Sequence, residues 1–178
     1  CLFVKNGAIA GYGQSSSTYE SAYGGAIYSD GEQGSNGITT VVANSTFDSN
    51  YVEVLTTSGW TKAADIFYGQ SSGNNATKYA YVFNSVITGS YQKGGSESNS
   101  NAEYKKDKVF HTDNTSNRIY VDYSTIEGSS GISWAANENV FDVTPVYNNA
   151  ANLDYSLSDL SPVIGKGTST YKNYNAPS

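Results

Sequence analysis

An internal repeat of about forty residues is the feature that most limits what this chain can fold into. Three segments, residues 38–47, 78–87 and 117–126, align with one another without gaps. Their equivalent positions lie forty and then thirty-nine residues apart. Repeats of this length are typical of folds in which each unit stacks on the next to bury its apolar face. We therefore expect equivalent residues to lie one above another.

Three positions recur within each copy of the repeat. A valine comes first, a serine follows three residues later, and a large apolar residue comes two residues after the serine. The N-terminal residues match the end of this pattern, with Cys1 at the serine position and Phe3 at the large apolar position. From these positions we predict one shared core and one polar ladder. The core residues are Phe3, Val42, Phe47, Val82, Ile87, Val121 and Ile126, and the ladder residues are Cys1, Ser45, Ser85 and Ser124, with Asn44 and Asn84 beside them.

The spacing of the two apolar positions predicts a bend. Val42 and Phe47 are an odd number of residues apart, so in one straight strand their side chains would face opposite sides. Both can reach one interior only if the chain turns between them, where the small pair Asn44-Ser45 stands. We expect a corner there and hydrogen bonds from serine to serine along the stack. At the N-terminal end of the serine ladder we expect Cys1 to be a buried small residue rather than a reactive thiol.

Composition favours strands over helices. The chain has 16 Tyr, 6 Phe and no Met, and its apolar residues suit a pleated, half-buried surface. Its 18 Gly, together with many Asn, Ser and Thr, supply turns. No long stretch places apolar residues at helical spacing. The sequence therefore predicts an all-β fold, a single-stranded parallel β-helix, or solenoid.

A glycine-led strand precedes the repeat. Residues 24–29 read Gly-Gly-Ala-Ile-Tyr-Ser, and residues 64–69 are a weaker version. Glycine before a short apolar strand suits a place where neighbouring backbones approach closely. Because forty residues exceed the length of one tight coil, we expect long loop excursions. These are residues 13–21, 30–37, 71–75 and 93–108.

These motifs resemble those of bacterial surface β-helix proteins. Gly24-Gly25-Ala26-Ile27 and Phe47-Asp48-Ser49-Asn50 look like the GGAI and FxxN signatures of the polymorphic outer-membrane protein repeats, and Phe3-Val4-Lys5-Asn6 is a further FxxN. Residues 152–167 contain the form DYxLxxxSPxIxxG, which is similar to the closing segment of the choice-of-anchor Q proteins. The resemblance covers most of the chain. The later repeats depart from it, because residues 87–90 and 126–129 lack the asparagine.

The resemblance implies a right-handed parallel β-helix, export, and attachment to a cell surface, but it implies no single activity. We expect a single β-helix domain over residues 1–178 that belongs to a longer chain, since the sequence starts within a repeat. Residues 1–139 would form stacked coils with loops, and residues 140–178 the last coil and a C-terminal cap. Pro145 and Pro162 in that last part remove backbone donors.

Charge and apolar runs exclude several partners. Ten Lys+Arg against sixteen Asp+Glu give a net charge of −6, which argues against binding nucleic acid. No apolar run is long enough for a transmembrane segment. Asp/Asn-rich turns could offer oxygen ligands to Ca²⁺, but no calcium-binding motif occurs, so we expect no cofactor and no metal.

Catalysis by a polysaccharide hydrolase or lyase is the alternative to a structural role. A hydrolase needs converging carboxylates, yet Asp48 aligns with Thr88 and then Glu127, and Asp122 aligns with Phe83 and Ala43. A lyase needs a base and a cation, for which His111 and Arg118 are the only candidates. We interpret these two as part of a polar loop.

We therefore expect a secreted, non-catalytic structural or adhesive protein, extracellular or attached to a bacterial cell surface. The ends of a solenoid expose unpaired backbone groups, so self-association end to end is expected, as are contacts with cell-surface material or polysaccharide. The alternative is a carbohydrate-binding or polysaccharide-degrading module of the same fold. The tyrosines could form a sugar-stacking surface in either case.

Overall fold

The computed structural model describes residues 1–11, 21–31, 39–55, 59–70, 79–94, 109–111, 118–130 and 136–170. Most of the predicted loop excursions lie outside these residues. The described residues are strands and turns, with a short 3₁₀ helix, η1 (Ala150–Asn152). The strands are β1 (Leu2–Val4), β2 (Gly7–Ala10), β3 (Ser21–Tyr23), β4 (Ile27–Gly31), β5 (Thr39–Ala43), β6 (Thr46–Asp48), β7 (Tyr51–Val54), β8 (Trp60–Lys62), β9 (Ile66–Gln70), β10 (Tyr79–Phe83), β11 (Val86–Thr88), β12 (Tyr91–Lys93), β13 (Phe110–His111), β14 (Arg118–Ile126), β15 (Ala136–Phe141), β16 (Tyr147–Asn149) and β17 (Asp154–Leu157).

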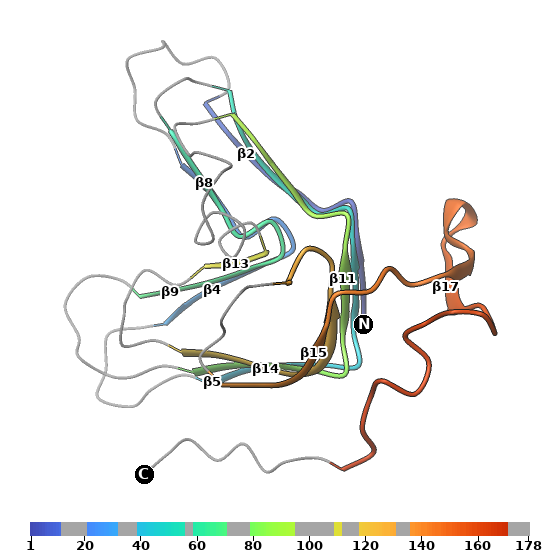
Figure 1. The fold of residues 1–178 in the computed structure, drawn as a ribbon. Coiled ribbons are helices and arrows are strands. Elements are labelled where there is room, and N and C mark those ends of the chain that lie inside the picture. The colour runs from blue at the N-terminus through green and yellow to red at the C-terminus, as the bar shows by residue number, and fades with distance from the viewer. Residues whose placement is uncertain are drawn as a thin grey trace.

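Successive strands return to the same place after about forty residues (Figure 1). Thus β6 pairs with β1 and β11, β7 with β2 and β12, β9 with β4 and β13, and β10 with β5 and β14, all in parallel. The pairs belong to several separate sheets, which the chain crosses in turn. The prediction of an all-β fold is confirmed, and the sheets formed by the repeats are parallel.

The register of these pairs matches the alignment of the repeat. Val82 lies opposite Val42 on one side and Val121 on the other. At the large apolar position, Phe47 lies opposite Phe3 and Ile87. Ile126 continues the row opposite Ile87, and the rings of Phe3 and Phe47 stack with centroids 4.6 Å apart. All of these residues pack in one hydrophobic cluster, with Phe3 only partly buried at its edge.

The described strands bury two apolar regions. The larger region holds the cluster just described, between the strands labelled β9 and β5 in Figure 1. The smaller lies between β2 and β8, where Ala22, Val52 and Val54 are buried against Ala8 and Ala10. Small side chains fit the smaller region because the strands there face each other across little space.

A left-handed backbone residue forms the predicted corner. Asn44, Asn84 and Tyr123 occupy one register position and have φ of 48°, 49° and 46°. Asparagine tolerates this conformation better than most residues do. The turn brings Val42 and Phe47 into the same cluster although they are an odd number of residues apart.

β15 departs from the forty-residue spacing. It pairs with β14 in parallel, with Val140 opposite Ser124, so the chain returns after sixteen residues. Other turns place about forty residues between such paired positions. The repeat did not reveal this strand, because its short spacing breaks the period and Val140 replaces the serine.

The last described segment lies beside the stack. β16 and β17 form an antiparallel pair joined through η1, and Figure 1 shows them outside the sheet that contains β11. Leu153 closes the turn in a left-handed conformation, with φ of 63°. Residues 142–170 thus run along an outer face of the stacked strands.

Candidate functional site

The serine ladder links neighbouring turns of the chain. The Ser45 amide donates to the Ser85 hydroxyl at 3.3 Å, and the Ser85 amide donates to the Ser124 hydroxyl at 3.2 Å. Each hydroxyl also donates to the carbonyl two residues earlier in its own turn. These hydroxyls are buried and serve as both donor and acceptor, so they act in the fold rather than as nucleophiles.

Cys1 lies at the exposed end of the ladder. Its terminal ammonium donates to the Asn44 carbonyl at 3.3 Å and to the Ser45 hydroxyl at 3.5 Å. The prediction that Cys1 is buried is wrong, because its side chain is exposed. In the part of the chain that the structure describes, no strand covers this side of β1.

A second polar network joins the FxxN motif to the glycine-led strand. The buried Asn50 accepts hydrogen bonds from the Asn6 amide and side chain and donates to Asp65 Oδ1 at 2.9 Å. Ser90, which follows Asn6 and Asn50 at the same position of the repeat, donates to Asp65 Oδ2. Asp65 is fully buried, so this carboxylate ties two walls of the interior together.

Sequence reasoning missed the role of Asp65. The sequence feature that could have indicated this role is that Asp65 is a single acidic residue in the otherwise apolar stretch before Ile66. The first copy of the motif has Ala26 at this position. The amides of Ala26 and Ile27 donate to the Asp65 carbonyl, so the two copies also bond through their backbones.

Close backbone approach accounts for the glycines of this motif. Gly24 has φ of 66°, a conformation that its equivalent Ala63 shares at 59°. A Cβ on Gly25 would overlap the carbonyl oxygens of Ala64 and Tyr51. The glycine therefore fits a place where three backbone segments meet.

Among the carboxylates, Asp48 lies in a hydrogen-bond network. It accepts hydrogen bonds from Thr88 Oγ1 at 3.0 Å, Ser49 Oγ at 3.3 Å and Tyr155 Oη at 2.8 Å. Glu127 accepts from the Gly89 amide at 2.6 Å. These carboxylates satisfy backbone and hydroxyl donors, which is the arrangement expected of turn-stabilising residues.

One carboxylate pairing was not foreseen. The return of β15 places Glu138 opposite Asp122 in register. The expectation that Asp122 aligns with Phe83 agrees with the β10–β14 register, but the repeat did not reveal the acidic residue opposite Asp122 on the other side of β14. The Glu138 side chain lies outside the described part of the structure.

His111 and Arg118 fall in different sheets. His111 is in β13 opposite Phe67, and Arg118 begins β14 opposite Tyr79. Both are strand residues rather than members of one polar loop, although residues 112–117 between them are not described. Across the ranges that the structure describes, no group of three or more His, Cys, Asp or Glu could hold a metal ion.

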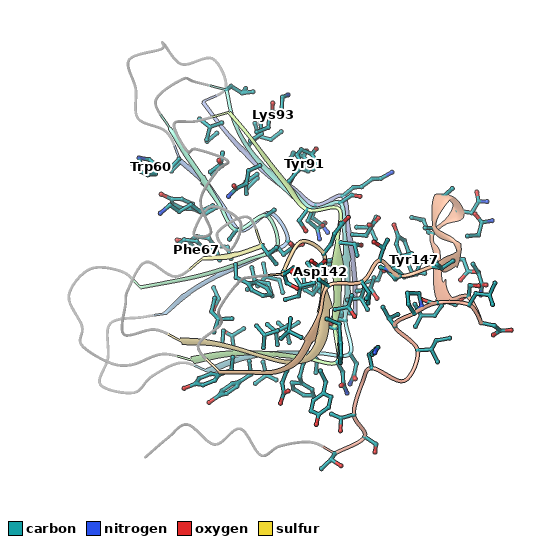
Figure 2. The ribbon with its side chains drawn as sticks, in the orientation of Figure 1. Trp60, Phe67, Tyr91, Lys93, Asp142 and Tyr147 are labelled. Atoms are coloured by element: carbon teal, nitrogen blue, oxygen red, sulfur yellow. The ribbon has the colours of Figure 1, made fainter. Side chains whose placement is uncertain are left out.

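Aromatic side chains gather where β3 and β8 meet β4 and β9. Tyr23 and Tyr28 each stack on Phe67, with centroids 4.8 Å apart in both pairs and planes 13° and 5° apart. Trp60 lies on β8 with the Lys62 ammonium 5.3 Å from its ring centroid. We call Tyr23, Tyr28, Trp60 and Phe67 the aromatic corner. Figure 2 shows Trp60 on the β3–β8 pair and Phe67 on the β4–β9 pair, two pairs that meet at an angle.

A different face carries a separate row of side chains. Tyr51 and Tyr91 stack with centroids 5.1 Å apart, and a Cβ on Gly7 would overlap the Tyr51 ring. Lys93 forms an ion pair with Glu53 beside them. Figure 2 places Tyr91 and Lys93 on this face, away from Trp60.

The C-terminal segment is held on the outer face by polar contacts. Asn84 Nδ2 donates to the Thr168 carbonyl at 2.7 Å, and the Thr168 amide donates to Asn84 Oδ1 at 2.9 Å. Burial raises the pKa of Tyr147 to about 12, and burial together with the hydrogen bond to Asp48 raises the pKa of Tyr155 to about 12.

Comparison with known proteins adds no assignment. No family model, curated protein or solved structure matches the chain. Among the described residues, none of the helical segments has the length and apolar character to span a membrane.

Proposed function

We propose that the chain is part of a right-handed parallel β-helix that serves as a non-catalytic structural or adhesive scaffold, extracellular or attached to a cell surface. The observation that carries this proposal is the return of the chain after about forty residues with equivalent residues in register. The resemblance of its GGAI, FxxN and C-terminal motifs to bacterial surface proteins supports the location.

The hydrogen-bonding state of the polar side chains supports a structural role. The serines, Asn50, Asp65 and Asp48 are engaged with one another or with backbone groups. A catalytic site instead requires acid and base groups directed at a space that a substrate can enter. The polar rows of this chain are better suited to holding turns together.

The proposed absence of catalytic activity is tested by measuring polysaccharide degradation. Purified chain would be incubated with neutral and acidic polysaccharides, and release of reducing ends or unsaturated products would be followed. We expect no product from any of them. Product formation that His111→Ala abolishes would replace the scaffold with the polysaccharide-degrading alternative.

Self-association through the ends of the stack is part of the proposal. Among the described residues, β1, β2, β4 and β5 each pair on one side only, and Ile9 and Val41 on these strands are 52% and 53% exposed. Unpaired strand edges are templates for further strands. We expect sedimentation to detect concentration-dependent association that Ile9→Lys with Val41→Lys weakens. A monomer at every concentration would refute this part.

A further inference from the structure

We propose that the aromatic corner binds a neutral polysaccharide. This inference deepens the proposed function, because it names the ligand class that an adhesive scaffold of this kind would hold. It depends on aromatic rings carried by two adjoining sheets, β3–β8 and β4–β9–β13, and three of these rings stack on one another.

The exposed rings rest on a fixed base. Phe67 is 1% exposed, and both tyrosines that stack on it come from strands on the same side, β3 and β4. Tyr28 is 55% exposed, and Tyr23 is partly buried. Aromatic rings with a hydroxyl at one end match a pyranose ring, which has an apolar C–H face and a rim of hydroxyls.

Trp60 adds a further exposed ring on β8. It is 44% exposed, and the residue opposite it in β3 is the small Ser21. Lys62, two residues on and opposite Tyr23, places its ammonium over the indole ring. Both neighbours are fixed by the strand register, so the indole is held on a rigid element, as recognition of a weakly interacting sugar requires.

Charge favours a neutral ligand over an acidic one. The chain has a net charge of −6, so a polyanion would meet overall repulsion. The six residues of β3 and β8 include a single charged side chain, Lys62.

More than one exposed ring favours a polymer of like units. Tyr28 on β4 and Trp60 on β8 are 55% and 44% exposed and lie on adjoining sheets. A chain of repeated sugar units can contact both rings, whereas a single sugar cannot.

Affinity electrophoresis of the purified chain tests the inference. Gels would contain hydroxyethylcellulose, laminarin, galactomannan or polygalacturonate, and retardation would be measured against a gel without polysaccharide. We expect retardation by at least one of the three neutral polymers. Trp60→Ala should weaken it about tenfold, and Tyr28→Ser should weaken it as well.

Tyr91→Ala is the matched control. Tyr91 is 43% exposed, close to the exposure of Trp60, but it lies on the other face. We expect it to leave retardation unchanged, with circular dichroism verifying that all variants are folded. Equal losses from Trp60→Ala and Tyr91→Ala would refute the assigned site.

Two further outcomes would also overturn the inference. One is retardation by polygalacturonate alone that added salt removes, because it would indicate a charge-driven site. The other is the absence of retardation by every polymer while the chain is folded. Neither outcome affects the scaffold proposal, which depends on strand register and on the turnover experiment.

Discussion

Gly25 shows how tightly single residues are constrained in this stack. A side chain there would overlap two carbonyl oxygens of other segments, which cannot move aside as a flexible side chain can. We expect Gly25→Ala to lower the free energy of unfolding by about 3 kcal/mol or more. Urea denaturation followed by circular dichroism measures this.

The control for this prediction is Gly128→Ala. Unlike Gly25, Gly128 has a positive φ, 76°, and no atom lies within 4 Å of the added Cβ. Only the backbone conformation disfavours alanine there, at a cost of about 1 kcal/mol. Similar losses at both glycines would mean that the close approach at Gly25 is absent.

The serine ladder gives a second prediction for single residues. Ser85→Ala leaves the Ser45 amide and the Phe83 carbonyl without their hydroxyl partner in a buried place. An unsatisfied buried group costs about 1–3 kcal/mol, so we expect a loss in this range in the free energy of unfolding. Ser130→Ala, at an exposed serine, should change it by less than about 0.5 kcal/mol. Equal values for the two variants would contradict a structural role for the ladder.

Residues at equivalent positions could be predicted from the sequence, whereas contacts between non-equivalent positions could not. The alignment placed Val82 opposite Val42 because a stack puts like residues over like. Asp65 meets Asn50 across the interior, and such a contact leaves no periodic trace in the sequence. Cys1 matched its position in the repeat, but its burial depends on a neighbouring turn that the described residues do not include.

At the scale of elements, the C-terminal segment makes the stack sensitive to high pH. Tyr147 and Tyr155 have pKa values raised to about 12 from an ordinary 10. A group whose folded pKa is raised stabilises the fold fully below its unfolded pKa, and that contribution is lost as the pH rises through the folded value. Docking of residues 142–170 should therefore weaken between about pH 10 and pH 12.

Spectrophotometric titration of tyrosinate checks this expectation. Two of the tyrosines should ionise about two pH units later than an ordinary phenol. Asp48→Asn removes the negative charge near both hydroxyls and should shift the late phase to lower pH. If Asp48→Asn leaves the titration curve unchanged, Asp48 does not hold the segment as the hydrogen bond to Tyr155 indicates.

The elements themselves were predictable to different degrees. The corner after β5 followed from the odd spacing between Val42 and Phe47, which no straight strand can satisfy. The early return of β15 did not follow, because its sixteen-residue spacing departs from the period. The antiparallel pair β16–β17 contacts the stack through Tyr155 and Thr168, and neither residue belongs to the repeat.

For the whole molecule, the register between strands about forty residues apart predicts that one turn can be removed. Deleting residues 45–84 joins Asn44 to Ser85 and takes out forty residues. The remaining strands then meet partners at equivalent positions, since β6 pairs with both β1 and β11 in the same register. We expect a folded, less stable protein, because the stability of repeat proteins is roughly a sum over units and interfaces.

Circular dichroism and urea denaturation of two deletions measure this. The control removes residues 45–64, which joins Asn44 to Asp65 and breaks the register. It should lose the cooperative transition that the forty-residue deletion keeps. A cooperative transition that is kept by the control and lost by the forty-residue deletion would show that the turns are not interchangeable.

The serine ladder also has a direction. Every link runs from an amide of the earlier turn to a hydroxyl of the later one, and it ends where Val140 offers no hydroxyl to Ser124. The dipoles of these hydrogen bonds therefore all point the same way. The two ends of the ladder differ chemically, because the first link starts at a backbone amide donor and the last turn offers no hydroxyl acceptor. Any filament built from such units would be polar, with different rates of growth at its two tips.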